Sequence, residues 1–135
     1  MKERIMRAVQ KEIRIHGLEQ HQRIIDGIIE ELHLEACAFD IRLILIEAIT
    51  NAYYHGNHSD ATKPIIIRYL LSGEQLELQV EDSGEGAGTV VFPDMISSDE
   101  LLDEGGRGLY LIRCFSDQVD MIHNTMYISK CVNPS

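Results

Sequence analysis

The segment from residue 35 to residue 54 constrains the fold more than any other part of this chain. Its pattern predicts a long helix that stops at Gly56, where a polar loop begins. Apolar side chains lie almost all round this helix, so it must be covered on more than one side. The cover could come from another helix of the same chain or from a second copy, and we expect a homodimer.

Three polar side chains interrupt this apolar helix at a spacing of four residues: Glu47, Asn51 and His55. Each step of four advances by about 40° around a helix, so the three lie along one edge, beside the buried face. A carboxylate buried without a partner costs several kcal/mol. These residues therefore either pair with neighbours to stabilise the fold or belong to a functional site.

Hydrophobic periodicity predicts further helices and strands along the rest of the chain. The expected helices are 18–32 and 108–115, and the expected strands are 11–16, 65–71, 75–81, 119–124 and 125–132. Residues 1–10 could be helix or tail, and residues 83–106 read as a long glycine-rich loop. These elements predict one α+β domain over residues 1–135, a two-layer sandwich with helices on one face of an antiparallel or mixed sheet.

Charge and composition argue against several classes of function. The chain carries 12 basic and 22 acidic residues, a net charge of −10, so we expect no direct nucleic-acid binding. Any phosphate site should then depend on backbone N–H groups and a divalent cation. No apolar run approaches the roughly 18 residues of a membrane span, and the N-terminal residues lack the apolar core of a signal peptide. Three widely spaced cysteines favour free thiols, and we expect a cytoplasmic protein without membrane contact.

Two glycine-rich segments follow the predicted strands 65–71 and 75–81, which we expect to form a hairpin. In "VEDSGEGAG" a predicted strand ends at Asp82, and Gly84 and Gly86 come directly after it. This is either an ordinary Asp-Ser-Gly turn or a place where glycines let a flat ligand approach the backbone. In "DEGGRGLYLI" glycines precede a predicted helix, which is either a flexible hinge or a phosphate site built from free N–H groups. The second segment lacks the Lys and Ser/Thr of a P-loop.

The order ExxxNAxxHG, DxGxG and GxGL resembles the histidine-kinase-like ATPase superfamily. The segments "EAITNAYYHGN" and "EGGRGLYLI" followed by "SDQVD" are further similar to bacterial anti-sigma factor serine kinases. The resemblance extends from about residue 11 to the end of the chain. It implies a Bergerat-type ATP-binding fold that uses ATP and Mg²⁺.

The resemblance also implies roles for individual residues. Glu47 would be the general base, Asn51 would supply an oxygen to Mg²⁺, and Asp82 would accept a hydrogen bond from the adenine amino group. Gly84 and Gly86 would make room for the base. Residues of the third segment would offer N–H groups to the phosphates, with Arg107 adding charge: Gly106, Arg107, Gly108 and Leu109.

Two further residues and a lid complete the site that the resemblance implies. His55 is expected near the phosphates and Thr125 near the adenine, and residues 87–104 would close over the phosphates. The chain departs from the family pattern in two ways. Arg107 stands where many relatives carry an apolar residue, and the lid is unusually acidic.

The resemblance implies an ATP-dependent protein serine kinase that also binds a sigma factor. Its partners would be that sigma factor and an anti-anti-sigma (STAS-type) antagonist, which it phosphorylates. The alternative is a regulatory module of the same fold with little or no phosphotransfer. The catalytic domain of a sensor histidine kinase is a weaker hypothesis, because 135 residues leave no room for its dimerising helix pair.

Overall fold

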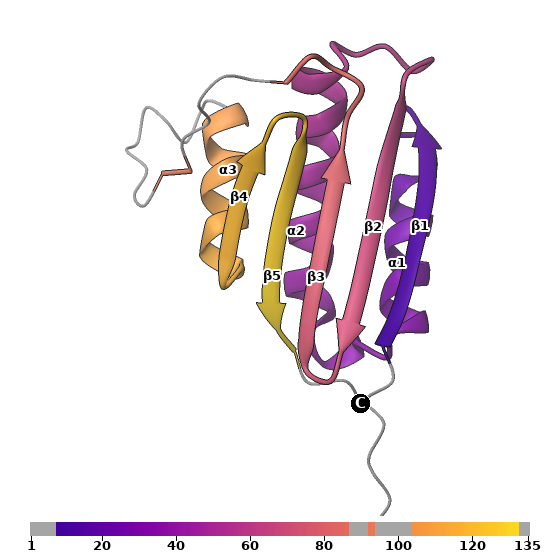
Figure 1. Ribbon diagram of the computed structural model, residues 1–135, viewed down its shortest axis with the longest axis vertical. Helices are drawn as coiled ribbons and strands as arrows, with labels where there is room; N and C mark the ends of the chain where they lie inside the picture. The colour runs from indigo at the N-terminus through magenta and orange to yellow at the C-terminus, as the bar shows by residue number, and fades with distance from the viewer. Residues whose placement is uncertain (1–7, 87–91, 94–103, 133–135) are drawn as a thin grey trace, which may run out of the picture.

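The computed structural model describes residues 8–86, 92–93 and 104–132 (Figure 1). The strands are β1 (Ala8–His16), β2 (Pro64–Ser72), β3 (Gln75–Glu81), β4 (Gln118–Ile122) and β5 (Thr125–Cys131). The α-helices are α1 (His21–Glu31), α2 (Ala38–Asn51) and α3 (Glu104–Phe115). A 3-10 turn, η1 (Glu35–Cys37), precedes α2, and a π-helical turn, η2 (Ala52–Gly56), continues it.

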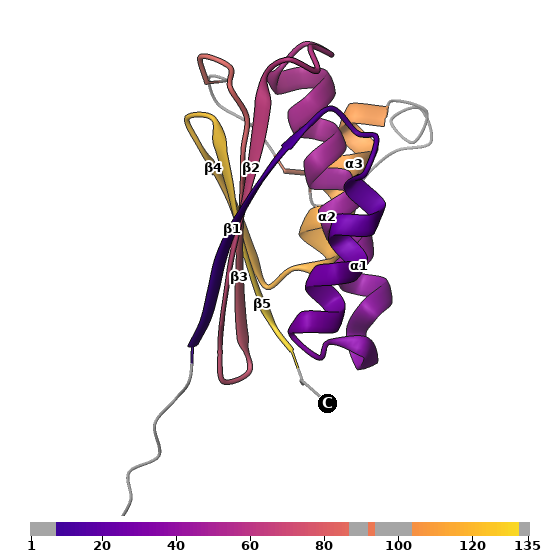
Figure 2. The same ribbon diagram turned by 90° about the vertical axis from the view of Figure 1, so that its right-hand side faces the viewer.

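The strands form one sheet in the order β1-β2-β3-β5-β4, and every neighbouring pair is antiparallel. All three α-helices lie on the same face of this sheet, as Figure 2 shows with the sheet seen edge-on. The predicted two-layer α+β sandwich is therefore confirmed, and its sheet is antiparallel throughout. No helix among the described residues is long and apolar enough to cross a membrane.

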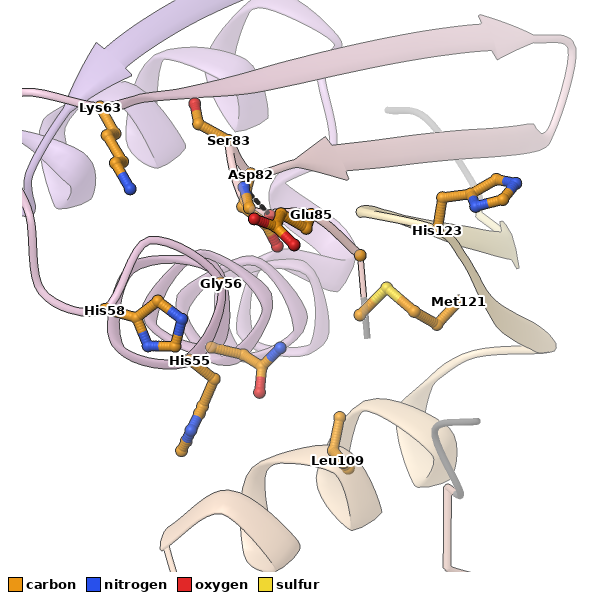
Figure 3. A pocket seen from close by; sticks show the side chains of 13 residues that line it. His55, Gly56, His58, Lys63, Asp82, Ser83, Glu85, Leu109, Met121 and His123 are labelled. Carbon is orange, nitrogen blue, oxygen red and sulfur yellow. Dashed lines mark hydrogen bonds between the residues drawn. The ribbon is translucent and has the colours of Figure 1, made fainter. Parts of the chain in front are cut away.

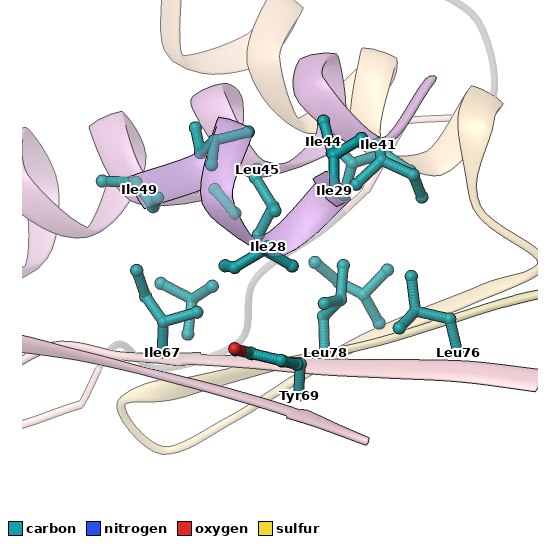
Figure 4. Packing of buried hydrophobic residues seen from close by; sticks show 14 of the residues in the cluster. Ile28, Ile29, Ile41, Ile44, Leu45, Ile49, Ile67, Tyr69, Leu76 and Leu78 are labelled. Atoms are coloured by element: carbon teal, nitrogen blue, oxygen red, sulfur yellow. The ribbon is translucent and has the colours of Figure 1, made fainter. Parts of the chain in front are cut away.

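Strict alternation in the central strands produces the core. Along β2, Ile65, Ile67, Tyr69 and Leu71 are buried, while the residues between them are half-exposed. In the antiparallel register Ile67 faces Val80, so the two strands present their apolar side chains to the same side. Isoleucines and leucines of α1 and α2 fill the space above them (Figure 4).

The apolar character of α2 is explained by its position between the other two helices. It packs against α1 on one side and against α3 on the other. Leu43 and Ile46, which lie away from the main core direction, are half-buried, whereas Tyr54 beyond the helix is 51% exposed. Most of the cover that this helix requires is thus supplied within the chain.

Several predicted boundaries are wrong. Strand β1 begins at Ala8, where the sequence suggested helix or tail, because its first residues pair with the end of β2. The predicted helix 35–54 is divided into η1, α2 and η2. Helix α3 begins at Glu104, so Gly105 and Gly106 lie in its first turn, whereas the sequence pattern placed them in a loop before it.

Helix α1 ends in a Schellman motif that carries no glycine. His33 adopts the left-handed conformation (φ 57°), and the N–H of Leu34 donates to the carbonyl of Ile29 at 2.9 Å. Leu34 is fully buried, which anchors the turn in the core. This tight ending places the start of α2 directly beside α1.

Replacement of a core isoleucine should be far more destabilising than the same change on the sheet edge. Ile28 is 1% exposed, and Ile28→Ala should lower the free energy of unfolding by about 2–5 kcal/mol. The matched control is Ile122→Ala, at a residue that is 53% exposed on β4. Chemical denaturation of both variants checks the prediction, and equal losses would contradict this description of the core.

Candidate functional site

A cleft of about 780 Å³ opens between the end of α2, the end of β3, helix α3 and the β4–β5 hairpin. Its volume is in the range of small-molecule sites. Figure 3 shows Asp82 and Glu85 at the centre, His55 and His58 beside the helix end, and Met121 and His123 on the hairpin side. The lining residues are Asn51, His55, Gly56, His58, Lys63, Asp82, Ser83, Gly84, Glu85, Gly86, Leu109, Met121 and His123.

A π-helical turn brings the end of the long helix onto the strand end. The N–H of Asn57 donates to the carbonyl of Ala52 at 2.8 Å, which widens the last turn. Such turns occur often at functional sites. Here the turn places the backbone of Gly56 directly against the carboxyl group of Asp82, where a β-carbon would overlap the carboxylate.

Asp82 is a buried carboxylate at the wall of the cleft. Its side chain is held by the N–H of Gly84, which donates to Oδ1 at 2.8 Å, and the residue is 8% exposed. Burial raises the pKa of this carboxyl group, although the bond from Gly84 opposes the rise. A β-carbon at Gly84 would lie 2.6 Å from the carbonyl oxygen of Gly56, so two glycines enclose Asp82.

Gly86 is the second glycine of the DxGxG segment, and its backbone is left-handed (φ 93°). A β-carbon there would lie 3.3 Å from the backbone of His123 in the β4–β5 turn. The glycine therefore allows the loop after β3 to approach the hairpin closely.

The structure brings six of the predicted site residues together around this cleft: Asn51, His55, Asp82, Gly84, Gly86 and Leu109. The other predicted residues do not line it: Glu47, Gly106, Arg107, Gly108 and Thr125. Glu47 lies one helical turn before Asn51, and its carboxylate is against α3, where Oε1 would be 2.7 Å from a β-carbon at Gly108. Arg107 is exposed, whereas Thr125 is buried and pairs with Glu81 at the end of β3.

Sequence reasoning missed several basic side chains of the site. His58, Lys63 and His123 line the cleft together with His55, although the chain as a whole is strongly acidic. His58 and Lys63 come from the polar loop after α2, and His123 comes from the last hairpin turn. Net charge carries no information about where individual charges lie, and only the fold brings these distant positions together.

The structure describes little of the predicted lid, and Asn51 stays the predicted Mg²⁺ ligand. The predicted lid, residues 87–104, falls outside the described residues except for 92–93 and the helix start at Glu104. Within the described part of the chain, no group of three or more His, Cys, Asp or Glu side chains is placed to hold a metal ion. The side-chain amide oxygen of Asn51 is a possible single protein ligand in the cleft.

The fold and the cleft together define an α+β sandwich with a cleft where the helix layer meets the strand ends. The chain belongs to the histidine kinase-like ATPase domain family, whose model matches residues 3–128. This confirms the superfamily that the three sequence segments indicate.

Similar curated proteins carry related names. An anti-sigma F factor of Oceanobacillus iheyensis is 25% identical over 103 residues, which cover 71% of this chain and 70% of that protein. An anti-sigma F factor of Clostridium perfringens is 29% identical over 99 residues, covering 72% and 66%. A serine-protein kinase RsbW of Listeria monocytogenes is 28% identical over 103 residues, covering 70% and 66%. The matched part of this chain thus spans about two thirds of each relative.

The contact between Gly56 and Asp82 predicts that alanine at position 56 is destabilising, whereas alanine at position 27, which has open space around it, is stabilising. Gly56→Ala should lower the free energy of unfolding by about 1–3 kcal/mol, because its β-carbon must displace the Asp82 carboxylate. Gly27→Ala, in α1 with open space around it, should raise stability by about 0.5–1 kcal/mol. Denaturant titration measures both, and a stabilising Gly56→Ala would show that the helix end does not press on Asp82.

Proposed function

We propose that this chain is an ATP-binding anti-sigma factor with protein serine kinase activity. It would regulate a sigma factor by partner switching, through phosphorylation of an anti-anti-sigma (STAS-type) antagonist. The observation that carries the proposal is the buried carboxylate of Asp82 between two glycines at the wall of a nucleotide-sized cleft. The family match and the names of the similar proteins support it.

Asp82 is the residue that we assign to recognition of the base. Its ionised carboxylate accepts hydrogen bonds only, and one of its oxygens is already bonded to Gly84. The adenine amino group is a donor, whereas guanine presents a carbonyl oxygen at the corresponding position. The carboxylate would therefore select adenine over guanine. Because Gly56 and Gly84 carry no side chain, the backbone can close around this carboxylate and hold it at the wall of the cleft.

The basic side chains and the first turn of α3 are suited to the phosphates. Lys63 would offset part of the triphosphate charge, and the ring N–H groups of the histidines in the cleft would donate hydrogen bonds to it. Because α3 begins at Glu104, the N–H of Gly106 lies in its first turn and has no partner inside the helix. Arg107 would instead contribute the charge of its exposed side chain. The N–H groups of Gly108 and Leu109 lie further along the helix, so Leu109 would contribute its side chain instead.

Asn51 would contribute to Mg²⁺ binding with its amide oxygen. Mg²⁺ at nucleotide sites takes much of its coordination from phosphate oxygens and water, so few protein ligands are needed. When bound, the cation would neutralise part of the charge on the transferred phosphate. Base recognition and proton transfer would be carried out by side chains of the protein.

Glu47 is the residue that we assign as general base. It would accept the proton of the substrate serine hydroxyl at a carboxylate oxygen as that hydroxyl attacks the terminal phosphorus. The bond from this phosphorus to the bridging oxygen would break, and ADP would leave. Its position on α2, one turn from Asn51 and against Gly108, places it at the junction of α2 and α3. Glu47 does not line the cleft, and this observation favours the second candidate, a regulatory ATP-binding module with little phosphotransfer. Homodimerisation stays a prediction.

Recognition of adenine by Asp82 predicts a particular pH dependence. Ionised Asp82 is required as acceptor, and burial raises its pKa, so adenosine affinity should fall with acidification from a higher pH than an ordinary aspartate would give. Asp82→Asn should bind adenosine about tenfold more weakly at neutral pH and lose this pH dependence. Calorimetry with adenosine, which has no phosphates, is the measurement.

The control for this experiment is Glu85→Gln, which removes another carboxylate from the same cleft. It should keep the pH dependence of the wild type. If Asp82→Asn retains that dependence, or if Glu85→Gln removes it, the assignment of Asp82 is wrong.

The two candidate functions differ in what they predict for Glu47→Gln. If Glu47 is the general base, the variant should bind ATP within a few-fold of the wild type, while phosphate transfer to a STAS-type antagonist falls by roughly 10² or more. Glu77→Gln, at an exposed carboxylate on β3, should leave transfer unchanged. Radiolabelled transfer assays with thermal melts are the measurement. A Glu47→Gln variant that melts early but transfers phosphate normally would make Glu47 structural.

A further inference from the structure

Asp82 lies one residue beyond the end of β3, where the sheet no longer holds the backbone. The last residue of the strand, Glu81, pairs with Ile66 on one side and with Thr125 on the other. Residues after a strand end are ordinarily free to vary in conformation. A carboxylate that recognises a base must keep a fixed direction. Other groups must therefore hold the backbone of Asp82 in place of the hydrogen bonds between strands.

Asn57 supplies one replacement from the end of the helix layer. It is completely buried, and its Oδ1 accepts a hydrogen bond from the N–H of Ser83 at 2.7 Å. Its Nδ2 donates to the carbonyl oxygens of Lys63 at 3.2 Å and Pro64 at 3.3 Å. The side chain therefore joins the end of η2, the start of β2 and the residue after Asp82.

Asn124 supplies the other replacement from the β4–β5 turn. Its Nδ2 donates to the carbonyl oxygen of Asp82 at 2.6 Å. The backbone carbonyl oxygen of Asn124 accepts a hydrogen bond from the N–H of Asp82 at 3.0 Å. Both backbone groups of Asp82 are thus bonded to a single residue of the hairpin turn.

We propose that Asn57 and Asn124 are positioning residues that fix the direction of the Asp82 carboxylate and so set the selectivity of the site for adenine. This inference rests on the proposed function and deepens it. Neither asparagine is assigned to contact the nucleotide, and Asn57 is enclosed by the fold. Each acts through the backbone of residues 82 and 83, while Gly84 orients the carboxylate itself.

A purely structural role would have a different signature. An asparagine that only stabilises the fold lowers the melting temperature, but it changes the affinity for every purine nucleotide alike. A positioning residue changes the preference for the amino group that Asp82 reads. The informative quantity is therefore the affinity for ATP divided by the affinity for purine riboside triphosphate, which lacks that amino group.

The experiment measures both nucleotides by calorimetry with Asn124→Ala and Asn57→Ala, each in the wild-type chain and in Asp82→Asn. The wild type should prefer ATP by about tenfold, the value of a hydrogen bond to a charged acceptor. Either asparagine substitution should remove most of this preference and change the purine riboside triphosphate affinity by less than about threefold. In Asp82→Asn, where the preference is already lost, neither substitution should reduce it further.

Tyr69→Phe is the matched control for loss of stability. It removes a hydrogen bond of 2.6 Å from the Tyr69 hydroxyl to Glu31, away from the cleft, and should keep the full preference for ATP. Asn124 is only half-buried, so Asn124→Ala carries the test if Asn57→Ala does not fold. A full preference for ATP in folded Asn124→Ala would overturn the inference alone. A wild type without any preference would overturn the proposed function and this inference with it.

Discussion

The contact between the end of the long helix and the Asp82 carboxylate determines the arrangement of the whole site. The π-helical turn carries the backbone of Gly56 onto this carboxyl group, and Gly84 closes over it from the loop after β3. Both approaches require that positions 56 and 84 carry no side chain. At this end of the sandwich the last turn of the helix therefore contacts the strand end at one acidic group, and the cleft opens beside that contact.

The charge around the cleft differs from the net charge of the whole chain. The chain has a net charge of −10, yet Lys63 and three histidines surround the cleft. The buried carboxylate of Asp82 lies in the same cleft. In the binding mode that we propose, this carboxylate would accept from the base and Lys63 would offset phosphate charge. The base of a bound nucleotide would then lie beside a hydrogen-bond acceptor, and its phosphates would lie beside a positive charge.

The sequence predicts the elements whose local pattern decides their structure. The strands β2 and β3 alternate regularly, and the predicted edges of β3 agree with the structure. The start of α3 was missed because glycines are poor helix formers, and only packing against α2 makes a helix there favourable. The polar edge of α2 and the DxGxG segment indicated Asn51, His55 and Asp82. The roles of Asn57, His58 and His123 depend on contacts between distant segments, which local patterns do not contain.

The proposed function requires that the cleft beside Asp82 binds adenine nucleotides through this carboxylate. A crystal structure of the chain with Mg²⁺ and a non-hydrolysable ATP analogue tests it most directly. We expect the adenine amino group to lie within hydrogen-bonding distance of the Asp82 carboxylate, with the phosphates directed toward Asn51 and the first turn of α3. A nucleotide bound elsewhere, or one whose base does not contact Asp82, would contradict it.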